Sequence, residues 1–495
     1  MWTRAGQSRI IERQDNRQSG MVMRDSVVHY NEMYEDDQVR EPYARLREWV
    51  ETMPDDFRQM KQAEAEALFR RIGITFAVYG EGGDPDRLIP FDMMPRVFEQ
   101  AEWRRLERGI KQRARALNAF LRDVYGRAEI VRAGRIPARL VFQNIAYEKS
   151  VVGMVPPRGI YSHIIGIDLV RTGKNDFYVL EDNCRTPSGV SYMLENREIM
   201  MRMFPQLFRE NRIEPVDQYS ELLRRTLESV APKKCQNRPT CVILTPGHFN
   251  SAYYEHSFLA NLMGVELVEG QDLFVDGEFV FMRTTQGPKR VDVIYRRIDD
   301  PFLDPLCFRP DSMLGVSGLM DVYRSGGVSI CSAPGAGVAD DKAIYTFVPE
   351  MIRFYLGEEP LLNNVQTWTL WKDDDYRYVM ENLADLVVKE VHGSGGYGML
   401  VGPKATRDEI ETFRKKIEAD PGNYIAQPTL ALSTCPTFVE QGIAPRHVDL
   451  RPFCLCGDRI ELVPGGLTRV ALREGSLVVN SSQGGGVKDT WVLSE

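Results

Sequence analysis

The sequence lacks the long apolar run that a membrane-spanning helix requires. No window approaches the roughly 18 uninterrupted apolar residues that are needed to cross the hydrocarbon core of a bilayer. The first 20 residues, MWTRAGQSRIIERQDNRQSG, contain no apolar core of the kind found in signal peptides. We therefore expect a cytoplasmic protein that does not bind a membrane.

Paired cysteines and an excess of basic residues are also missing. The eight cysteines are scattered singly, apart from Cys454 and Cys456, and no CxxC pair is present. This spacing indicates reduced thiols and argues against a structural zinc site. The formal net charge is -8, whereas a general nucleic-acid binder needs a basic surface to neutralise phosphates. We expect no nucleic-acid partner, although a local basic groove is compatible with this composition.

What the sequence does contain is typical of a folded multidomain enzyme. Hydrophobic residues make up 43% of the chain and charged residues 27%, close to the averages for globular proteins. A chain of 495 residues is too long for one ordinary hydrophobic core, so it should divide into roughly two to four lobes.

The pattern of apolar residues divides the chain into five segments. Residues 1–25 lack periodicity and are predicted to form a mobile tail, and residues 26–138 are predicted to be mainly helical. Residues 139–230 begin with short Val- and Ile-rich runs, ARLVFQNIAY, SHIIGIDLVR and DFYVLEDN, which predict antiparallel strands. Residues 231–335 are typical of an α/β lobe, and residues 336–495 form a second mixed lobe. The predicted fold class is α/β (α+β).

The clearest group of candidate functional side chains lies on the predicted hairpin. Asp168 is on its first strand, and Glu181 and Asn183 are two residues apart on the second, so they share one face of the sheet. Magnesium binds hard oxygen ligands and shares its other positions with water and phosphate, so this set suits a metal that accompanies ATP. The alternative is an ordinary polar strand edge. The upstream aspartate and the following RTPSG loop favour the metal site.

A second motif, DLVVKEVHGSGGYGMLVG, combines a buried strand ending in Lys389 with a glycine-rich loop. The loop contains Gly393, Ser394, Gly395, Gly396 and Gly398. Backbone amides can approach phosphate oxygens closely at glycines, and such a loop can open and close over a nucleotide. Lys389 would supply a positive charge to the phosphates. Neither GKS nor GKT follows, so this is not a Walker motif, and a plain hairpin turn is the alternative.

Four further residues are candidates for contact with a nucleotide. Lys342 begins a predicted helix and is either a nucleotide lysine or an ordinary surface lysine. Gln427, in the short apolar strand NYIAQPTL, could lie in an adenine pocket or be an unrelated buried polar residue. Arg451 and Arg469 could bind a transferring phosphoryl group or an acyl phosphate, or could form structural salt bridges.

Two other regions are polar enough to contact a ligand. The last segment, LVVNSSQGGGVKDTW, combines Asn480, Gln483 and Lys488 with three glycines and is predicted to form a ligand-covering loop, with a flexible tail as the alternative. PGHFNSAYYEH and YRRIDDPFLD could line an acceptor or carboxylate pocket, and structural roles are equally compatible with them. Their polar residues include Asn250, Tyr253, Glu255, His256, Arg296 and Arg297.

Together these motifs resemble the circularly permuted ATP-grasp family, type 2. DLV, VLEDNCRTPSGVSYMLENR, ADDK, VVKEVHGSGGYG and NSSQGGGVKDTW carry the likeness, which covers nearly the whole chain beyond the N-terminal tail. More distantly, the chain is similar to glutathionylspermidine synthases, whose ligase domain has the same permuted order. In ordinary ATP-grasp enzymes the ExN metal strand follows the phosphate-binding lysines, whereas here it precedes them. The resemblance implies a circularly permuted ATP-grasp fold with an α/β pre-ATP-grasp-like lobe and an N-terminal helical region.

The resemblance also implies a role for each matching residue. The magnesium ligands correspond to Asp168, Glu181 and Asn183, the nucleotide lysines to Lys342 and Lys389, and the phosphate lid to residues 393–398. Gln427 is similar to the adenine-edge residue, and Arg469 to the arginine near the reacting phosphate. In the synthases an arginine stands two residues before the first metal aspartate, where this chain has Gly166. Arg158 and Arg185 are candidate substitutes that the sequence does not rank.

The implied reaction uses ATP and Mg²⁺, and two magnesium ions are compatible with the site. A substrate carboxylate is phosphorylated, and an amine attacks the acyl phosphate, with release of ADP and phosphate. No protein nucleophile is needed, so Cys184 can be a packing residue. The partners would be small-molecule or peptide carboxylates and amines, and a homo-oligomer is left open. An ATP-dependent phosphotransferase and a non-catalytic nucleotide-binding module are alternatives, and retention of all three metal ligands argues against the latter.

Overall fold

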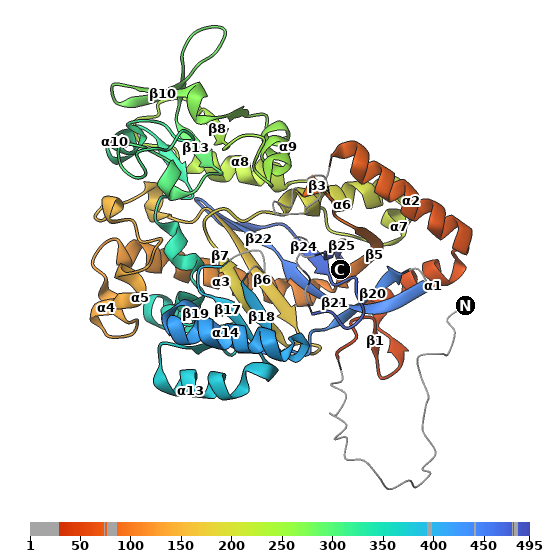
Figure 1. Cartoon of the computed structure of the whole chain (residues 1–495). Coiled ribbons are helices and arrows are strands. Elements are labelled where there is room, and N and C mark those ends of the chain that lie inside the picture. The colour runs from red at the N-terminus through yellow and green to blue at the C-terminus, as the bar shows by residue number, and fades with distance from the viewer. Residues whose placement is uncertain are drawn as a thin grey trace, which may run out of the picture.

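The computed structural model describes residues 29–73, 75–76, 87–393, 398–439, 442–477, 479 and 484–495. The predicted tail at 1–25 lies outside these residues, as do Ser394, Gly395, Gly396, Asn480 and Gln483. The described chain is a mixture of helices and strands arranged around several sheets (Figure 1). The predicted α/β class is therefore confirmed. None of the described helices is both long and apolar enough to cross a membrane.

A large, mostly antiparallel sheet forms the centre of the molecule. In the described part of the chain it has ten strands, with the main order β15-β7-β6-β21-β24-β25-β5, while β20 pairs with β21, and β22 with β6 and β23. Its strands are β5 (Phe91–Phe98), β6 (Ile164–Arg171), β7 (Phe177–Asn183), β15 (Asn363–Asn364), β20 (Thr434–Val439), β21 (Gly442–Arg451), β22 (Phe453–Cys456), β23 (Ile460–Leu462), β24 (Leu467–Val470) and β25 (Gly486–Val492). Strands from both ends of the chain therefore build one layer.

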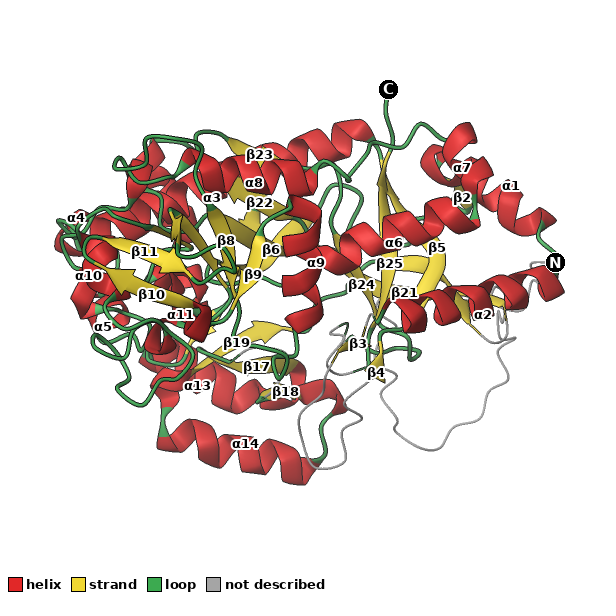
Figure 2. Cartoon of the chain, turned by 90° about the horizontal axis from the view of Figure 1, so that it is seen from above, coloured by secondary structure: helices red, strands yellow, loops and turns green. Residues whose placement is uncertain are grey.

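A smaller antiparallel sheet carries one of the predicted nucleotide motifs. It consists of β16 (Trp368–Thr369), β17 (Leu386–Glu390), β18 (Met399–Val401) and β19 (Tyr424–Pro428), in the order β16-β19-β17-β18. Apolar residues of this sheet pack on α13 (Asp373–Asn382) and α14 (Arg407–Ala419). The two helices cover the outer side of the small sheet, away from the central one (Figure 2). The opposite face is thus left for contact with a ligand.

The third unit is the predicted α/β lobe. Its parallel sheet has the order β14-β13-β8-β9, with a separate three-stranded sheet beside it. The strands are β8 (Cys241–Leu244), β9 (Glu266–Val268), β13 (Val293–Arg296) and β14 (Ser329–Cys331), then β10 (Leu273–Asp276), β11 (Phe279–Met282) and β12 (Lys289–Val291). With α9 (Tyr253–Met263) between β8 and β9, the chain alternates strand and helix and then forms the β10–β11 hairpin.

The remaining helices cover the central sheet and the α/β lobe. They are α1 (Ala44–Thr52), α2 (Asp55–Ile72), α3 (Gln100–Val124), α4 (Glu129–Arg132), α5 (Ala138–Phe142), α6 (Val190–Met203), α7 (Pro205–Glu210), α8 (Tyr219–Ser229), α10 (Leu319–Arg324), α11 (Lys342–Tyr345) and α12 (Val348–Met351). Two short hairpins pair β1 (Tyr34–Glu35) with β2 (Gln38–Val39) and β3 (Thr75–Phe76) with β4 (Arg87–Leu88). The longest of these helices is α3, which lies in the region predicted to be mainly helical.

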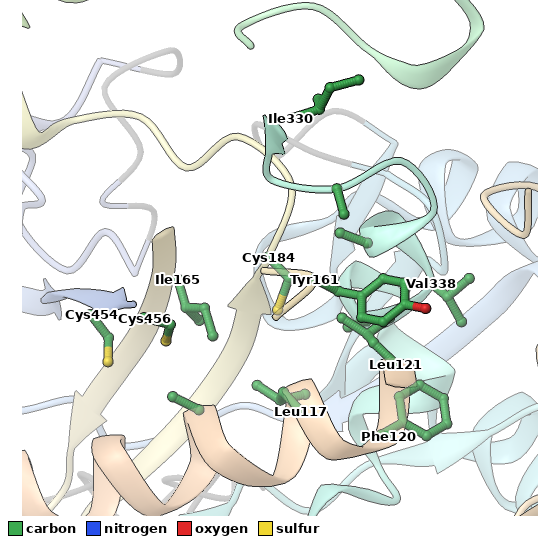
Figure 3. Packing of buried hydrophobic residues seen from close by; sticks show 14 of the residues in the cluster. Leu117, Phe120, Leu121, Tyr161, Ile165, Cys184, Ile330, Val338, Cys454 and Cys456 are labelled. Atoms are coloured by element: carbon green, nitrogen blue, oxygen red, sulfur yellow. The ribbon is translucent and has the colours of Figure 1, made fainter. Parts of the chain in front are cut away.

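The buried face of α3 provides much of the main hydrophobic core. Leu117, Phe120 and Leu121 point from this helix toward Tyr161 and Cys184 (Figure 3). Cys184 is fully buried, and burial raises the pKa of its thiol well above the usual range. A neutral thiol inside an apolar core is a poor nucleophile, which agrees with its expected packing role.

Two local predictions are wrong. ARLVFQNIAY was expected to be a strand, but Ala138–Phe142 forms α5, which follows Pro137 and buries only Val141. The C-terminal segment LVVNSSQGGGVKDTW was expected to form a ligand-covering loop, but its last part, Gly486–Val492, is the buried strand β25. The prediction for Asn480 and Gln483 lies outside the described residues. Lys488 is 0% exposed and donates to the Asp92 carboxylate and to the Pro436 carbonyl oxygen. Lys488 therefore finds its hydrogen-bond partners inside the protein, on segments that are distant in the sequence.

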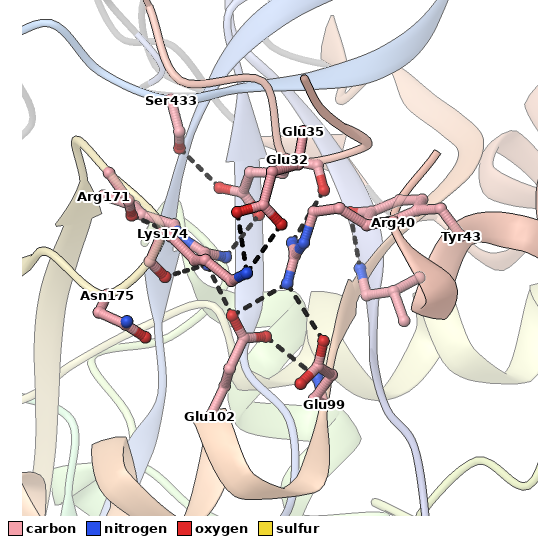
Figure 4. Close-up of polar contacts among 12 residues, drawn as sticks. Glu32, Glu35, Arg40, Tyr43, Glu99, Glu102, Arg171, Lys174, Asn175 and Ser433 are labelled. Atoms are coloured by element: carbon pink, nitrogen blue, oxygen red, sulfur yellow. Dashed lines mark hydrogen bonds and ion pairs between the residues drawn. The ribbon is translucent and has the colours of Figure 1, made fainter. Parts of the chain in front are cut away.

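A buried ionic network anchors the segment that precedes α1 to the central sheet. The carboxylate of Glu32 accepts hydrogen bonds from Arg96 of β5 at 2.6 and 2.9 Å. It also accepts one from Ser433 at 2.6 Å and lies 3.5 Å from Arg171 of β6 (Figure 4). Burial raises the pKa of Glu32, but Arg96 and Arg171 outweigh it and hold that pKa at about 2. Glu32 is therefore ionised and paired on several sides.

We predict that Glu32→Ala lowers the free energy of unfolding by about 3–5 kcal/mol, because it leaves buried arginines without their partner. Denaturant unfolding of the variant and the wild type would measure this. Glu35→Ala is the control, since Glu35 pairs with Lys174 at the surface, and it should leave the unfolding midpoint unchanged. An unchanged midpoint in Glu32→Ala would contradict the role of the network.

The same network makes stability depend on pH in a defined window. The folded-state pKa of Glu32, about 2, lies below its ordinary value of 4.5. Its contribution is therefore complete above about pH 4.5 and is lost as the pH falls toward 2. The stability gap between the wild type and Glu32→Ala should shrink over that range.

Candidate active site

A cavity of about 650 Å³ lies between the central sheet and the small sheet. This is a common size for a small-molecule site. Ten of the residues predicted from the sequence line it: Asp168, Glu181, Asn183, Arg185, Lys342, Lys389, Gly393, Gln427, Arg451 and Arg469. Gly398 is not among the lining residues; it has a φ of +67° at the end of the loop, where a Cβ would lie 2.9 Å from the Glu390 carboxylate.

The β6–β7 hairpin presents the predicted metal ligands to this cavity. In this hairpin Asp168 pairs with Glu181 and Gly166 with Asn183, but Leu169 pairs with Val179, so Leu180 is the extra residue of a β-bulge. On the other side of β7, Asp182 is buried and accepts two hydrogen bonds from Arg113 of α3, at 2.6 and 2.7 Å. Of two neighbouring carboxylates on β7, that of Glu181 faces the cavity and that of Asp182 is paired in the core.

Asp168 is the electrostatic centre of the site. It is 1% exposed, and its Oδ2 accepts hydrogen bonds from the Nη2 atoms of Arg451 at 2.7 Å and Arg469 at 2.8 Å. Although burial raises the pKa of Asp168, the two arginines hold it well below its usual range. Arg469 also pairs with Asp449 of β21. Two guanidinium groups are thereby fixed at the wall of the cavity.

Gly166 makes room for Arg451. A Cβ at position 166 would lie 2.9 Å from the Cβ of Pro187 and 3.3 Å from the Cδ of Arg451. The side chain of Arg451 thus crosses the place where the resemblance led us to expect an arginine on β6. Of the substitutes named from the sequence, Arg158 binds the Ser229 carbonyl oxygen outside the cavity lining, and Arg185 lines the cavity but pairs with Asp299 and Asp340.

The two predicted lysines approach the site from different elements. Lys342 begins α11, whose first amides are capped by Asp341, and its Nζ lies 3.6 Å from Glu181 and donates to the Gly393 carbonyl oxygen at 2.5 Å. Lys389 ends the cavity face of β17 and donates to Gln427 Oε1 at 2.8 Å. Burial lowers the pKa of Lys389 to about 8. Two cations therefore face the carboxylates of the hairpin.

Sequence reasoning missed the apolar part of the cavity. It is lined by Val170, Leu180, Val365, Leu430, Leu432 and Leu477. These residues come from four separate segments, so no local pattern marks them. All six also belong to one small apolar cluster. A flat, weakly polar ring could be buried there, beside the charged groups.

The hairpin residues fit a magnesium ion. Asn183 donates from Nδ2 to the Gly166 carbonyl oxygen at 3.2 Å, which leaves Oδ1 as the acceptor atom of the amide. Glu181 makes only long ion pairs, at 3.6 and 3.8 Å. Among the described residues, no group of three or more His, Cys, Asp or Glu side chains could hold a metal ion. Magnesium, however, commonly takes one or two protein carboxylates and completes its shell with phosphate and water.

The predicted polar residues of the α/β lobe do not line the cavity. His256 binds Thr245, and burial lowers its pKa to about 2, so it is neutral. Arg296 donates to the carbonyl oxygens of Ser332 and Ile298. Ser251 and Ala252 do line the cavity; they belong to the predicted segment PGHFNSAYYEH but were not among the residues named from it.

A large sheet that carries carboxylates, facing a small antiparallel sheet that carries a lysine, defines an ATP-grasp architecture. The family model for circularly permuted ATP-grasp type 2 matches residues 95–471, and the chain belongs to that family. The resemblance drawn from the motifs is thus confirmed. The permutation is visible in the fold, because the β6–β7 hairpin precedes the small sheet in the chain.

Several relatives align over most of the chain. "Uncharacterized protein sll0335" of Synechocystis is 54% identical, over 92% of this chain and 95% of its own length. "Uncharacterized protein Rv2411c" of Mycobacterium tuberculosis is 53% identical, over 92% and 82%. A Frankia alni protein named "Putative glutamate--cysteine ligase 2-3" is 40% identical, over 92% of this chain but 52% of its own length.

One solved structure supports the fold. The apo form of a glutathione synthetase-like effector from Globodera pallida aligns with a TM-score of 0.57, over 89% of this chain and 98% of that chain. The sequences are 12% identical, so the likeness concerns the fold alone.

We predict that Gly166→Ala destabilises the protein by about 1–3 kcal/mol, because the added methyl group overpacks the site against Pro187 and Arg451. Thermal and denaturant unfolding would measure the loss. Gly422→Ala is the matched control, since its Cβ would meet only Asp420 Oδ1, at 3.6 Å. Equal effects of the two substitutions would show that no close contact surrounds position 166.

Proposed function

We propose that the protein is an ATP-dependent ligase that joins a carboxylate to an amine through an acyl-phosphate intermediate, with release of ADP and phosphate. One observation carries the proposal: two lysines, two arginines and the oxygen donors of the hairpin converge on one cavity that also has an apolar part. This combination suits a nucleoside triphosphate and the phosphoryl group that it transfers.

The nucleotide is held along the small sheet. Its base enters the apolar part of the cavity, where Gln427 is the adenine-edge residue. Lys342 and Lys389 bind the phosphates, and Lys342 gives up its bond to the Gly393 carbonyl oxygen as it does so. The loop at 393–398 covers the phosphates and keeps water away from the reactive intermediate.

The phosphoryl group is transferred beside Asp168. Arg451 and Arg469 bind its oxygens through guanidinium groups that Asp168 already orients, so little reorganisation is needed when charge develops. Glu181 and Asn183 would hold magnesium, which would supply charge neutralisation to the phosphates. Asp168, the third ligand that the resemblance implies, has both carboxylate oxygens bound by the two arginines and serves as their anchor. Arg185 is the third candidate arginine and lies nearer the substrate. No protein nucleophile takes part, and Cys184 stays in the core.

The proposed reaction has two steps, which together join the carboxylate to the amine. The carboxylate oxygen attacks the γ-phosphorus of ATP and ADP leaves; the amine nitrogen then attacks the acyl carbon and phosphate leaves. The name of the Frankia alni relative makes L-glutamate and L-cysteine the first pair to test. The catalytic groups work by position and charge.

Hydroxylamine trapping tests this function without knowledge of the amine. Wild-type protein with Mg²⁺, ATP, hydroxylamine and L-glutamate, or a γ-glutamyl peptide, should form a hydroxamate in equal amount to ADP. A stable phosphorylated product without hydroxamate would make the protein a phosphotransferase. AMP and pyrophosphate would exclude the acyl-phosphate route, and nucleotide binding without product would leave a binding module.

We predict that Glu181→Gln slows hydroxamate formation by on the order of 100-fold, because it removes charge from the magnesium site. Its unfolding midpoint should stay close to that of the wild type, since the side chain makes only long ion pairs. Glu198→Gln, at an exposed position of α6, is the control and should keep full activity. A variant that unfolds rather than slowing would show that Glu181 is structural.

Nucleotide binding can be measured separately. A non-hydrolysable ATP analogue with magnesium, at about 100 times its dissociation constant, should stabilise the wild type by about 2.7 kcal/mol. We predict that Lys389→Ala loses most of this gain in thermal unfolding, because it removes a phosphate-binding charge. Lys415→Ala, at an exposed position of α14 in the same lobe, should keep it. Retained stabilisation in Lys389→Ala would exclude that lysine from the site.

A further inference from the structure

One wall of the cavity is a loop that the α/β lobe holds from behind. Residues 186–189, directly after the metal-ligand strand β7, line the cavity. Along β7 the chain passes from the apolar part at Leu180, through Glu181 and Asn183, and into this loop. Since a strand advances about 3.3 Å per residue, the loop lies beyond the metal ligands, on the side away from the apolar part. It therefore faces the place left for the carboxylate substrate.

Two buried residues of the α/β lobe fix this loop. Arg297, directly after β13, donates to the Pro187 carbonyl oxygen at 3.0 Å and to Ser188 Oγ at 2.5 Å. It also binds Glu255 of α9 at 3.0 Å. Glu255 Oε2 in turn accepts hydrogen bonds from the Gly189 amide at 2.7 Å and from the Ser191 amide and hydroxyl at 3.1 and 3.0 Å. The two residues of this ion pair thus form hydrogen bonds with every residue from 187 to 191 except Val190.

Burial of this ion pair carries a desolvation cost that offsets its contribution to stability. Arg297 is 6% exposed and Glu255 2%, so both charges are removed from water. A buried ion pair is often no more stabilising than apolar residues of the same size. Its geometry instead fixes a loop, because the Glu255 carboxylate occupies the amides at the start of α6. The pair is better explained by the position it imposes on the cavity wall.

The wall itself offers polar groups without partners. Thr186, Tyr192 and Ser251 line the cavity, and no described residue hydrogen-bonds to their hydroxyl groups. Arg185 stands beside them with its guanidinium held by two aspartates. Three hydroxyls and a guanidinium suit a polar, hydrogen-bonding ligand better than an aliphatic chain, which would leave them without partners.

We propose that Arg297 and Glu255 are a positioning pair that sets the affinity for the carboxylate substrate, and that this substrate is a small polar acid of the amino-acid type. The inference rests on the proposed ligase activity. Neither residue lines the cavity, so both act through the loop at 186–189. The nucleotide base and phosphates are held by other elements, the small sheet and α11, so nucleotide binding depends less on the pair than substrate binding does. Arg451 links the two regions, since it donates to the Ser188 carbonyl oxygen of the loop at 3.2 Å.

Steady-state hydroxamate assays test the pair. In Glu255→Gln and Arg297→Lys, the KM for L-glutamate should rise about tenfold or more, while the KM for ATP stays within about threefold of the wild type. Asp489→Asn is the matched control, because it weakens another buried ion pair of α6, with Arg197 at 2.9 Å, that does not touch the loop. It should lower thermal stability and leave both KM values unchanged. Equal rises in both KM values, or an unchanged KM for glutamate, would overturn the proposal.

The substrate class and the loop have their own tests. Hexanoate should give no hydroxamate under conditions in which glutamate does, and equal use of both acids would overturn the assigned class. If the wild type makes no hydroxamate with any acid, the ligase function fails, and amide hydrogen exchange then decides on the pair. The amides of Gly189 and Ser191 should exchange faster in Glu255→Ala than in the wild type or Asp489→Asn. Unchanged exchange would show that the pair does not hold the loop.

Discussion

The buried carboxylate of Asp168 imposes the arrangement of the central sheet. A charge at this depth must be neutralised, and its two arginines come from β21 and β24, whose sequence positions are nearly 300 residues away. Arg469 requires Asp449 as a second partner, and the Asp449 carbonyl oxygen accepts a hydrogen bond from Arg96. Arg96 is paired with Glu32. An alternating series of charges therefore extends from the cavity wall to the segment before α1. The geometry of the candidate site thus depends on the packing of that N-terminal segment.

The parts of the site that the sequence predicted are those whose geometry is local. Two-residue spacing within one hairpin placed Glu181 and Asn183 on one wall, and the strand before the glycine-rich loop placed Lys389. The sequence could not predict that the Arg451 side chain lies against Gly166. The two residues are on β21 and β6, and these strands meet only in the folded sheet. Lys488 was misjudged for the same reason: its partner Asp92 lies 396 residues earlier. The β-bulge at Leu180 also leaves no mark in a period-two pattern.

The division of labour between lobes follows from the permuted order. One hairpin carries the oxygen donors and leads, after two intervening residues, into the loop at 186–189, so the proposed metal ligands and the proposed substrate wall are continuous in the chain. The small sheet comes later in the sequence and carries the residues that the proposed function assigns to the nucleotide. The α/β lobe, inserted between them, reaches the cavity mainly through the loop that it holds. Three separately folded units thus meet at one chemical centre.

The bond from Lys342 to the Gly393 carbonyl oxygen occupies an ammonium group that the proposed function assigns to a phosphate. The same ammonium group lies 3.6 Å from the Glu181 carboxylate, so protein atoms already balance its charge. Under the proposed function a phosphate would displace the carbonyl oxygen, and the energetic gain would be the difference between an anionic and a neutral acceptor for the same ammonium group. Such an exchange would favour ligands by their charge more than by their shape.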